Sequence, residues 1–264
     1  MVRIQTSSNS VGKRAVSSGL VSSKNVVLVI QHEEDAPLGY LGEWLIDSQV
    51  EVKVVKPYLG EVVPSNLDEY SGLIVLGGAM GVHDEAECPW LVPTKSLLRS
   101  AAENQVPTLG VCLGGQLLAD ATGGRVERSD NAEIGVCAIS LLEEAQDDEI
   151  LSGVSNVGIP VLVPQYHQDA IVELPEDAVL LASSDDCRVQ AFRIGENVWG
   201  VQFHPETDKN IMQDWLTSLD PARKGVSITD QEVMQDYQQF GEVMKDNWSS
   251  LGKAFAEVVK TYRK

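Results

Sequence analysis

A cysteine set between glycines has the residue types and the spacing of a nucleophile. Cys112 lies in Gly110-Val-Cys-Leu-Gly114, after an apolar run and before a helical pattern. This is typical of a nucleophile elbow, a sharp strand-to-helix turn whose crowding favours glycine two residues to either side. The N-terminus of the following helix favours the thiolate, and the backbone N–H of Leu113 is placed to stabilise an oxyanion. On this motif alone, a structural cysteine in a tight turn is the alternative.

A cysteine nucleophile needs a base, and the base needs a group that orients it. Of the four histidines, His204 ends an apolar run and is followed two residues later by Glu206. Residues i and i+2 of an extended segment face the same way, so Glu206 can bond one imidazole nitrogen while the other faces Cys112. The sequence therefore predicts a Cys112–His204–Glu206 triad. We interpret His167 as a pocket wall or a loop-ordering residue and not as a second base.

The elements that must position these residues alternate between strands and helices. Three continuous apolar runs are typical of strands buried on both faces of a parallel sheet: residues 26–30, 73–76 and 107–111. Helical patterns at residues 38–48 and 91–104 separate them. This rhythm predicts an α/β fold with a doubly wound, mostly parallel sheet and flanking helices. Residues 133–203 read mainly as strands joined by turns, so we expect a mixed sheet with an antiparallel section.

The chain is expected to divide into three parts. A Ser-rich disordered leader occupies residues 1–24, an α/β domain residues 25–222, and an amphipathic helix residues 223–264. Because the leader contains Arg and no acidic residue, a transit peptide is its alternative interpretation. Thr229 followed by Glu232 is the signature of a capping box at the start of the last helix. The apolar face of this helix is expected to pack on the domain, with a dimer or partner interface as the alternative.

Composition excludes some classes of partner. The formal net charge of −19 argues against nucleic acid and anionic membrane surfaces. No apolar run approaches the roughly 18–20 residues that span a bilayer, and no secretory signal is evident, so we expect a cytoplasmic protein with reduced thiols. No cofactor or metal is expected. Cys137 and Cys187 are expected to be buried and Cys88 to lie in a loop, while His32 and the three acidic residues after it are interpreted as a solvated loop.

Taken together, the motifs resemble those of the class I (triad) glutamine amidotransferases. Gly-Val-Cys112-Leu-Gly-Gly-Gln116 and Gln-Phe-His204-Pro-Glu206 lie about 90 residues apart, as in that family, and Leu-Gly-Gly78-Ala-Met is similar to its oxyanion loop. The resemblance is greatest to the free-standing branch related to the glutaminase domain of GMP synthase, which also includes plant γ-glutamyl peptidases. Further matches occur at residues 133–135, 167–169 and 187–193.

The resemblance implies a flavodoxin-like fold and hydrolysis of the side-chain amide of glutamine or of a related γ-glutamyl amide. Cys112 would form a γ-glutamyl thioester, His204 would protonate the departing ammonia and then activate water, and Glu206 would hold His204. The backbone N–H groups of Gly78 and Leu113 would form the oxyanion hole. The glutamine pocket would be lined by Gln116 and by a loop containing Tyr166, His167 and Gln168.

The resemblance also bears on partners and on substrate. No nucleotide-binding loop is evident, so the ammonia is expected to pass to a separate synthetase chain. Two alternative functions stay open: a stand-alone γ-glutamyl peptidase and a catalytically silent regulatory module. A homo-oligomer is also possible. Three residues depart from the family pattern: Ala79 replaces a common Pro, Gly115 a common Ala or other small residue, and Val136 a common Trp. The first two leave the triad intact, whereas Val136 bears on the acceptor or substrate side of the pocket.

Overall fold

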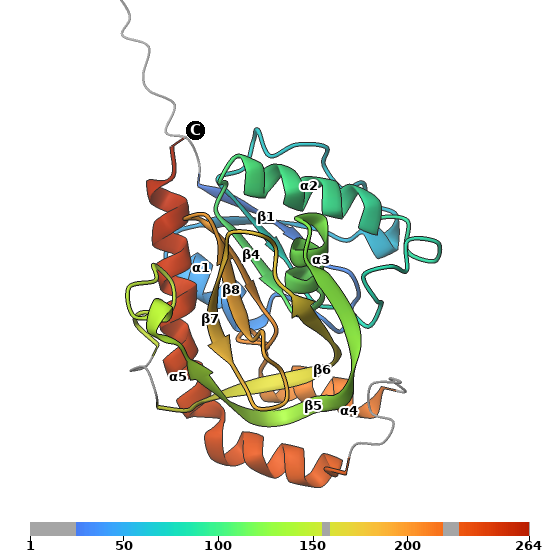
Figure 1. The fold of residues 1–264 in the computed structure, drawn as a ribbon, viewed down its shortest axis with the longest axis vertical. Helices are drawn as coiled ribbons and strands as arrows, with labels where there is room; N and C mark the ends of the chain where they lie inside the picture. Colours follow the sequence, from blue (N-terminus) through green and yellow to red (C-terminus); the bar gives the residue numbers. More distant parts are fainter. Residues whose placement is uncertain (1–24, 155–158, 219–226, 264) are drawn as a thin grey trace, which may run out of the picture.

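The computed structural model describes residues 25–154, 159–218 and 227–263 (Figure 1). The predicted leader and the predicted boundary at residues 222–223 lie outside these ranges. A sheet of nine strands in the order β2-β1-β3-β4-β9-β8-β7-β5-β6 forms the centre of the molecule. Helices lie on both of its faces, which confirms the predicted α/β class with a mixed sheet.

The sheet has a parallel half and an antiparallel half. The parallel strands are β2 (Glu51–Val55), β1 (Val26–Ile30), β3 (Gly72–Val75), β4 (Thr108–Val111) and β9 (Val198–Val201). The antiparallel strands are β8 (Ala191–Ile194), β7 (Ala178–Ser183), β5 (Arg125–Leu141) and β6 (Val161–Glu173). The apolar runs that predicted buried strands form β1, β3 and β4, because helices cover both of their faces.

Two hydrophobic cores, one on each face of the sheet, account for the helices. On one face, α1 (Gly39–Asp47), α4 (Lys209–Thr217) and α5 (Asp230–Thr261) contribute to a single core cluster. On the other face, α2 (Leu91–Glu103) and α3 (Leu113–Ala121) contribute to a second cluster. Two short 3-10 turns complete the elements: η1 (Pro57–Leu59) and η2 (Glu143–Ala145).

The predicted capping box begins α5. The Thr229 hydroxyl accepts from the Glu232 N–H, and the Glu232 carboxylate accepts from the Thr229 N–H. The apolar side of α5 is buried within the chain: the side chains of Trp248 and Phe255 are at most 1% exposed, and Trp248 Nε1 donates to the carbonyl of Leu162 at 2.9 Å. Packing on the domain therefore accounts for its apolar stripe. Among the described residues, no helix is both long enough and apolar enough to cross a membrane.

The main departure from the sequence-based expectation lies in β5 and β6. The sequence predicts strands at residues 133–142 and 157–163, whereas β5 spans Arg125–Leu141 and β6 spans Val161–Glu173. Tyr166, His167 and Gln168, predicted to lie in a loop, belong to strand β6. Because these residues are polar, they lack the apolar pattern from which a strand is predicted. Pairing with β5 provides partners for backbone N–H and C=O groups of this segment: His167 stands opposite Glu133, and Tyr166 stands opposite Ile134.

The strand order creates a crevice at one edge of the sheet. In the order β2-β1-β3-β4, the chain progresses in opposite directions on the two sides of β1, and such a switch point leaves a crevice at the carboxyl ends of the strands. The segments that follow β1, β3, β4 and β9 all end at this edge: residues 31–36, residues 76–81, Cys112 and residues 202–206.

Candidate active site

Cys112 occupies the turn between β4 and α3, and its backbone is strained. Its φ of 50° and ψ of −109° lie outside the regions that a residue with a side chain normally adopts. A Cβ on Gly114 would lie 1.9 Å from the carbonyl oxygen of Val75, and one on Gly110 would lie 2.5 Å from that of Gly114. The turn therefore has the elbow geometry that the glycine spacing predicts, with the thiol at the carboxyl edge of the sheet.

His204 follows β9 and is held in place by Glu206. Nδ1 of His204 lies 2.7 Å from Oε1 of Glu206, and both side chains are buried. Burial by itself would lower the pKa of His204, but the negative charges of Glu206 and Cys112, together with hydrogen bonds to both, raise that pKa above its usual range. Because Glu206 takes Nδ1, Nε2 is the nitrogen left for Cys112. The structure thus brings the three predicted triad residues together.

A second side chain reaches the sulfur of Cys112. Nε2 of Gln202 donates to Sγ at 3.6 Å, while Oε1 of Gln202 accepts from Nε2 of Gln116 at 3.1 Å. Gln116 is itself buried and also donates to the carbonyl of Asp169 at 2.8 Å. Gln202 was missed from sequence, although it belongs to the same short motif as His204. Its role becomes visible only when the strands place it beside the elbow.

The loop after β3 faces the elbow, with His32 beneath it. A Cβ on Gly78 would lie 3.3 Å from Cδ2 of Leu113 and 3.1 Å from Cβ of His32, and the Ala79 N–H donates to Oε1 of Glu33 at 2.9 Å. The two residues predicted for the oxyanion hole, Gly78 and Leu113, are therefore neighbours.

The predicted solvated loop around His32 is wrong for His32 itself. Its side chain is fully buried, and its Nδ1 accepts from Nε1 of Trp90 at 3.1 Å. Burial lowers the pKa of His32 to about 4, so the ring is neutral and supports the loop from below. The acidic residues after it, Glu33 and Asp35, line a cavity at the site.

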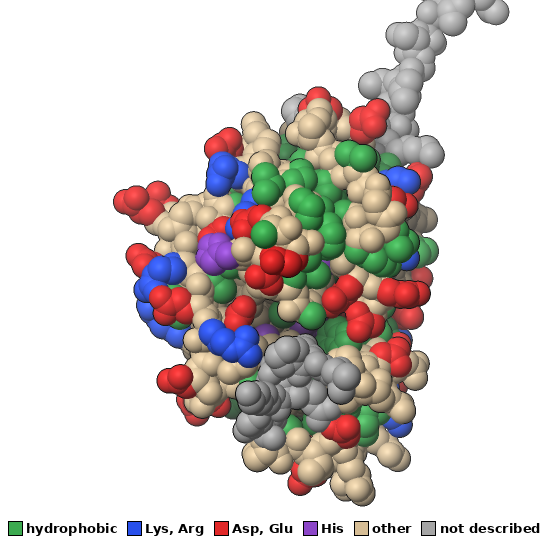
Figure 2. All heavy atoms as spheres, turned by 90° about the vertical axis from the view of Figure 1, so that its right-hand side faces the viewer, with side chains coloured by type: hydrophobic (Ala, Val, Ile, Leu, Met, Phe, Trp, Pro, Cys, Tyr) green, Lys and Arg blue, Asp and Glu red, His purple; other side chains and the backbone are tan. Residues whose placement is uncertain are grey.

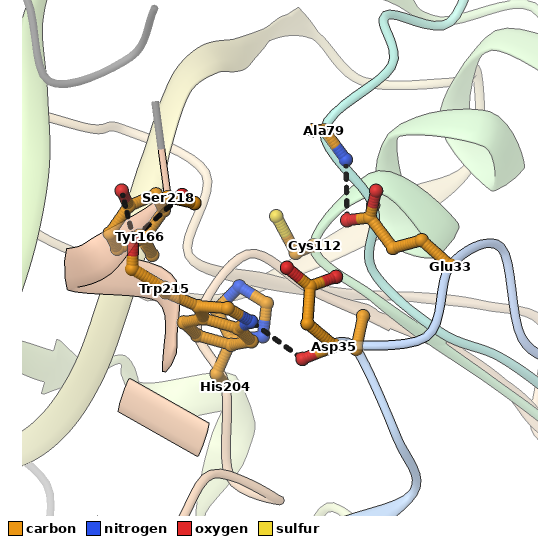
Figure 3. A pocket seen from close by; sticks show the side chains of 10 residues that line it. Glu33, Asp35, Ala79, Cys112, Tyr166, His204, Trp215 and Ser218 are labelled. Atoms are coloured by element: carbon orange, nitrogen blue, oxygen red, sulfur yellow. Dashed lines mark hydrogen bonds between the residues drawn. The ribbon is translucent and has the colours of Figure 1, made fainter. Parts of the chain in front are cut away.

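Two cavities meet at Cys112, and both are bounded by Gly78, Ala79 and Tyr166. The first, which we call the polar cavity, has a volume of about 270 Å³ and is otherwise lined by Met80, Gly81, Asp84, Gln116, Arg128, His167, Gln168 and Asp169. The second, which we call the tryptophan cavity, has a volume of about 290 Å³ and is otherwise lined by Glu33, Asp35, Ala36, His204, Trp215 and Ser218 (Figure 3).

All four predicted pocket residues line the polar cavity: Gln116, Tyr166, His167 and Gln168. Arg128, which sequence reasoning missed, joins them, since its guanidinium hydrogen-bonds the side chain of Gln168 and lies 3.7 Å from the carboxylate of Asp169. The residues peculiar to the tryptophan cavity, His204 apart, were also missed as site residues. The position of Asp35 directly after β1 could have indicated it, because the carboxyl edges of strands hold ligands in α/β folds, whereas Trp215 has the pattern of a core residue of α4.

A third group of residues also contains a cysteine, a histidine and a glutamate. The ligand atoms of Glu133, His167 and Cys187 lie within 4.8 Å of one another. Nε2 of His167 lies 3.0 Å from Oε2 of Glu133, and Nδ1 donates to the carbonyl of Asp169 at 3.0 Å, so both ring nitrogens are occupied. Burial opposes ionisation of Glu133, yet hydrogen bonds from His167, Ser184 and Gln190 hold its pKa below the usual range. We interpret the group as a hydrogen-bonded structural cluster.

The other cysteines and Val136 lie away from the cavities. Cys187 is buried as predicted, whereas Cys137 is half-buried, and burial raises the pKa of both thiols to about 12. Cys88 is half-buried in the loop before α2. Val136, predicted to bear on the substrate pocket, packs against the hydrophobic core instead, because its place in β5 turns it away from the crevice.

Comparison with known proteins agrees with this geometry. Residues 41–217 match the family model described as glutamine amidotransferase class-I. Gamma-glutamyl peptidase 3 of Arabidopsis thaliana is 33% identical over 152 residues, which cover 56% of this chain and 59% of that protein. A glutamine-hydrolyzing GMP synthase component from Pyrococcus abyssi, named as one subunit of that enzyme, is 37% identical over 137 residues, which cover 52% of this chain and 66% of that protein.

The three-dimensional comparison extends over more of the chain. The crystal structure of a glutamine amidotransferase from Thermotoga maritima superposes with a TM-score of 0.77 and 26% identity, covering 89% of this chain and 99% of that one. The match therefore includes the order of strands that places the elbow, the histidine and the crevice together. The chain belongs to the class-I glutamine amidotransferase family.

Proposed function

We propose that this protein hydrolyses the side-chain amide of glutamine, or of a related γ-glutamyl amide, through Cys112, His204 and Glu206. One observation carries the proposal: a cysteine on a strained elbow shares a buried site with a histidine whose Nδ1 is held at 2.7 Å by a glutamate. That arrangement activates a thiol and orients its base at the same time. The catalytically silent alternative gives no reason for such a strained and complete set.

The chemistry follows from these positions. Sγ of Cys112 attacks the amide carbon, and the backbone N–H groups of Gly78 and Leu113 stabilise the oxyanion. The protonated His204 gives its proton to the departing nitrogen, which leaves a γ-glutamyl thioester on Cys112. His204 then takes a proton from water, whose oxygen attacks the thioester and releases glutamate. Glu206 keeps the imidazole in the required orientation throughout.

The polar cavity is suited to the amino-acid end of the substrate. Gln116, Tyr166, His167 and Gln168 supply its wall, and Arg128 provides a guanidinium for the α-carboxylate. The carboxylates of Asp84 and Asp169 provide partners for the α-ammonium group.

A separate synthetase chain is the proposed destination of the ammonia. Two observations support this part: the relative from Pyrococcus abyssi is named as one subunit of GMP synthase, and no nucleotide-binding loop is evident in the present sequence. The chemistry of the site calls for no metal or cofactor, since a thiol, an imidazole and backbone donors complete the acyl transfer.

The test is the release of ammonia from L-glutamine by the purified chain, with L-asparagine as the matched control. Asparagine is one methylene shorter, so its amide should not reach Cys112 when its head group fills the polar cavity. We expect glutamine to be hydrolysed at least about a hundredfold faster than asparagine, and rapid quenching to trap a γ-glutamyl group on Cys112. Absence of both the adduct and the hydrolysis of any γ-glutamyl amide would refute the proposal.

A further inference from the structure

The tryptophan cavity lies on the side of Cys112 from which the leaving group must depart. His204 lines the tryptophan cavity and not the polar cavity. In the proposed reaction His204 protonates the departing nitrogen, so that nitrogen must face His204 when the amide bond breaks. With the amino-acid end of the substrate in the polar cavity, whatever is attached to the nitrogen therefore extends into the tryptophan cavity.

This cavity is far larger than ammonia requires. Its volume of about 290 Å³ compares with the roughly 10–15 Å³ that one water-sized molecule needs by the same measure. Its wall is also well anchored: Nε1 of Trp215 donates to the carbonyl of Asp35 at 2.7 Å, and the Trp215 ring packs edge-on against His204 with ring centroids 4.6 Å apart. The carbonyl of Trp215 accepts from the hydroxyl of Tyr166 at 3.1 Å. Asp35, His204 and Trp215 thus bound a space that lies outside the polar cavity.

The lining of the tryptophan cavity combines apolar surface with negative charge. Ala36 and Trp215 supply the apolar surface, and the carboxylates of Glu33 and Asp35 supply the charge; no Lys or Arg is among the described residues that line it. Figure 3 shows the Asp35 carboxylate directed into the cavity toward Cys112, while Glu33 is turned to the Ala79 N–H. The polar cavity differs, because it contains Arg128.

The wider surface carries both signs of charge. Figure 2 shows a face with most of its Lys and Arg side chains at the left of the view, among several Asp and Glu, whereas Asp and Glu predominate at the right. Because the formal net charge is −19, the protein as a whole attracts an approaching cation and repels an anion.

We infer that the tryptophan cavity is a leaving-group subsite for N-substituted γ-glutamyl amides, and that it selects leaving amines with an alkyl chain ending in a positive charge. This inference rests on the proposed function, since it assigns the substrate class of the same thiol. In the reaction the Cys112 Sγ–carbon bond forms and the carbon–nitrogen bond breaks. The departing diamine takes the proton of His204, and water then hydrolyses the thioester to glutamate.

A series of substrates with leaving amines of similar length tests the subsite. In the γ-glutamyl amides of 1,4-diaminobutane, butylamine and 4-aminobutanoate, the far end of the leaving amine is cationic, neutral and anionic, respectively. Glutamine is the reference without a substituent. We expect kcat/KM to fall in the order cationic, neutral, anionic, with about a tenfold or larger difference between the first and the last.

A pair of variants assigns the charge preference to the cavity. Asp35→Asn removes a carboxylate from its lining, and Glu34→Gln removes one from the neighbouring position, which does not line it; both residues are exposed. We expect Asp35→Asn to lower the cationic-to-anionic ratio of kcat/KM by about threefold to fivefold and Glu34→Gln to leave that ratio unchanged. The ratio is taken within each variant, so a general loss of activity does not affect it.

The outcomes separate the two proposals. Hydrolysis of glutamine without hydrolysis of any substituted amide would overturn the subsite and leave the proposed function standing. A preference for the anionic amide, or an equal change of the ratio in both variants, would overturn the charge selection. Failure of every substrate to form a thioester would instead refute the proposed function.

Discussion

Two buried groups in this protein contain a cysteine, a histidine and a glutamate. They differ in the hydrogen-bond partners of the histidine ring nitrogens. In the first, Glu206 occupies one nitrogen of His204 and leaves the other for Cys112. In the second, both nitrogens of His167 are occupied, one by Glu133 and the other by the carbonyl of Asp169. The first group can therefore transfer a proton, whereas the second is closed by its own hydrogen bonds.

The two sulfur atoms differ in the same way. Sγ of Cys112 accepts a hydrogen bond from Gln202 and lies at the junction of two cavities. Sγ of Cys187 donates to the carbonyl of Val189 at 3.5 Å, and burial raises the pKa of its thiol to about 12. One sulfur thus accepts a hydrogen bond at the cavities, whereas the other donates one to a buried carbonyl. Residue composition alone does not distinguish a reactive group from a structural one; the direction of each hydrogen bond does.

The largest expected effect separates the two cysteines. Cys112→Ala should lower kcat for γ-glutamyl amide hydrolysis by roughly 10⁴-fold or more, because no other described residue offers a nucleophile at the elbow. Cys187→Ala should change kcat by less than about threefold and lower the free energy of unfolding by about 1 kcal/mol. Ammonia release and chemical denaturation measure the two quantities. Similar losses of activity in both variants would remove the distinction between the two groups.

The next largest difference is expected between substitutions of the two glutamates, Glu206 and Glu133. Glu206→Gln keeps the shape but removes the charge beside His204, so we expect kcat to fall by roughly 10²-fold. The alkaline limit of activity should also move to lower pH, because that charge raises the pKa of His204. Glu133→Gln should act mainly on stability, by roughly 1–3 kcal/mol, since it leaves buried partners poorly paired. A pH–rate profile of Glu133→Gln with the same alkaline shift would contradict the assignment.

Gln202 provides a smaller test on the reactive side. Gln202→Leu removes the N–H that donates to Cys112 and should lower kcat by about tenfold with little change in KM, because the contact is to the sulfur and not to the substrate. Gln165→Leu is a matched control, since Gln165 is equally buried and donates to Gln190 in the closed group. If the role of Gln202 were purely structural, kcat would fall in both variants, in each case in proportion to its loss of stability.

The smallest expected effects are in the pH dependence of the free energy of unfolding. The group with Glu133 is expected to lose its contribution at acidic pH, and the group with His204 at alkaline pH. The pKa of Glu133 is lower when folded, so its contribution is present above about 4.5 and is lost as the pH falls through the folded value. The pKa of His204 is higher when folded, so its contribution is present below about 6.5 and is lost as the pH rises through the folded value. Denaturation of wild type, Glu133→Gln and Glu206→Gln across pH checks both signs.

Much of the fold was predictable because burial on both faces leaves a simple signal. Continuous apolar runs marked β1, β3 and β4, and the glycines on either side of Cys112 marked the elbow. Strand β6 was predicted too short because residues 164–169 include a polar run; these side chains face a cavity and a buried cluster, so no apolar alternation is needed.

The site was only partly predictable. Each of the four histidines has an acidic residue two positions further on, so this spacing alone does not select His204. Its place at the end of a strand beside the elbow does, and that depends on strand order. Trp215 looks like a core residue of an amphipathic helix, and Asp35 looks like a loop residue. Their meeting at one cavity follows from tertiary packing that no local pattern records.

Covalent labelling tests the central claim most directly. A diazoketone or chloroketone analogue of glutamine places an electrophile where the amide carbon would lie and reports on the nucleophile without any need for turnover. We expect a single adduct on Cys112, formed faster than any adduct on Cys187 and prevented by excess glutamine, as measured by intact mass and peptide mapping. An adduct on another cysteine, or labelling of Cys112 that glutamine does not slow, would contradict the account.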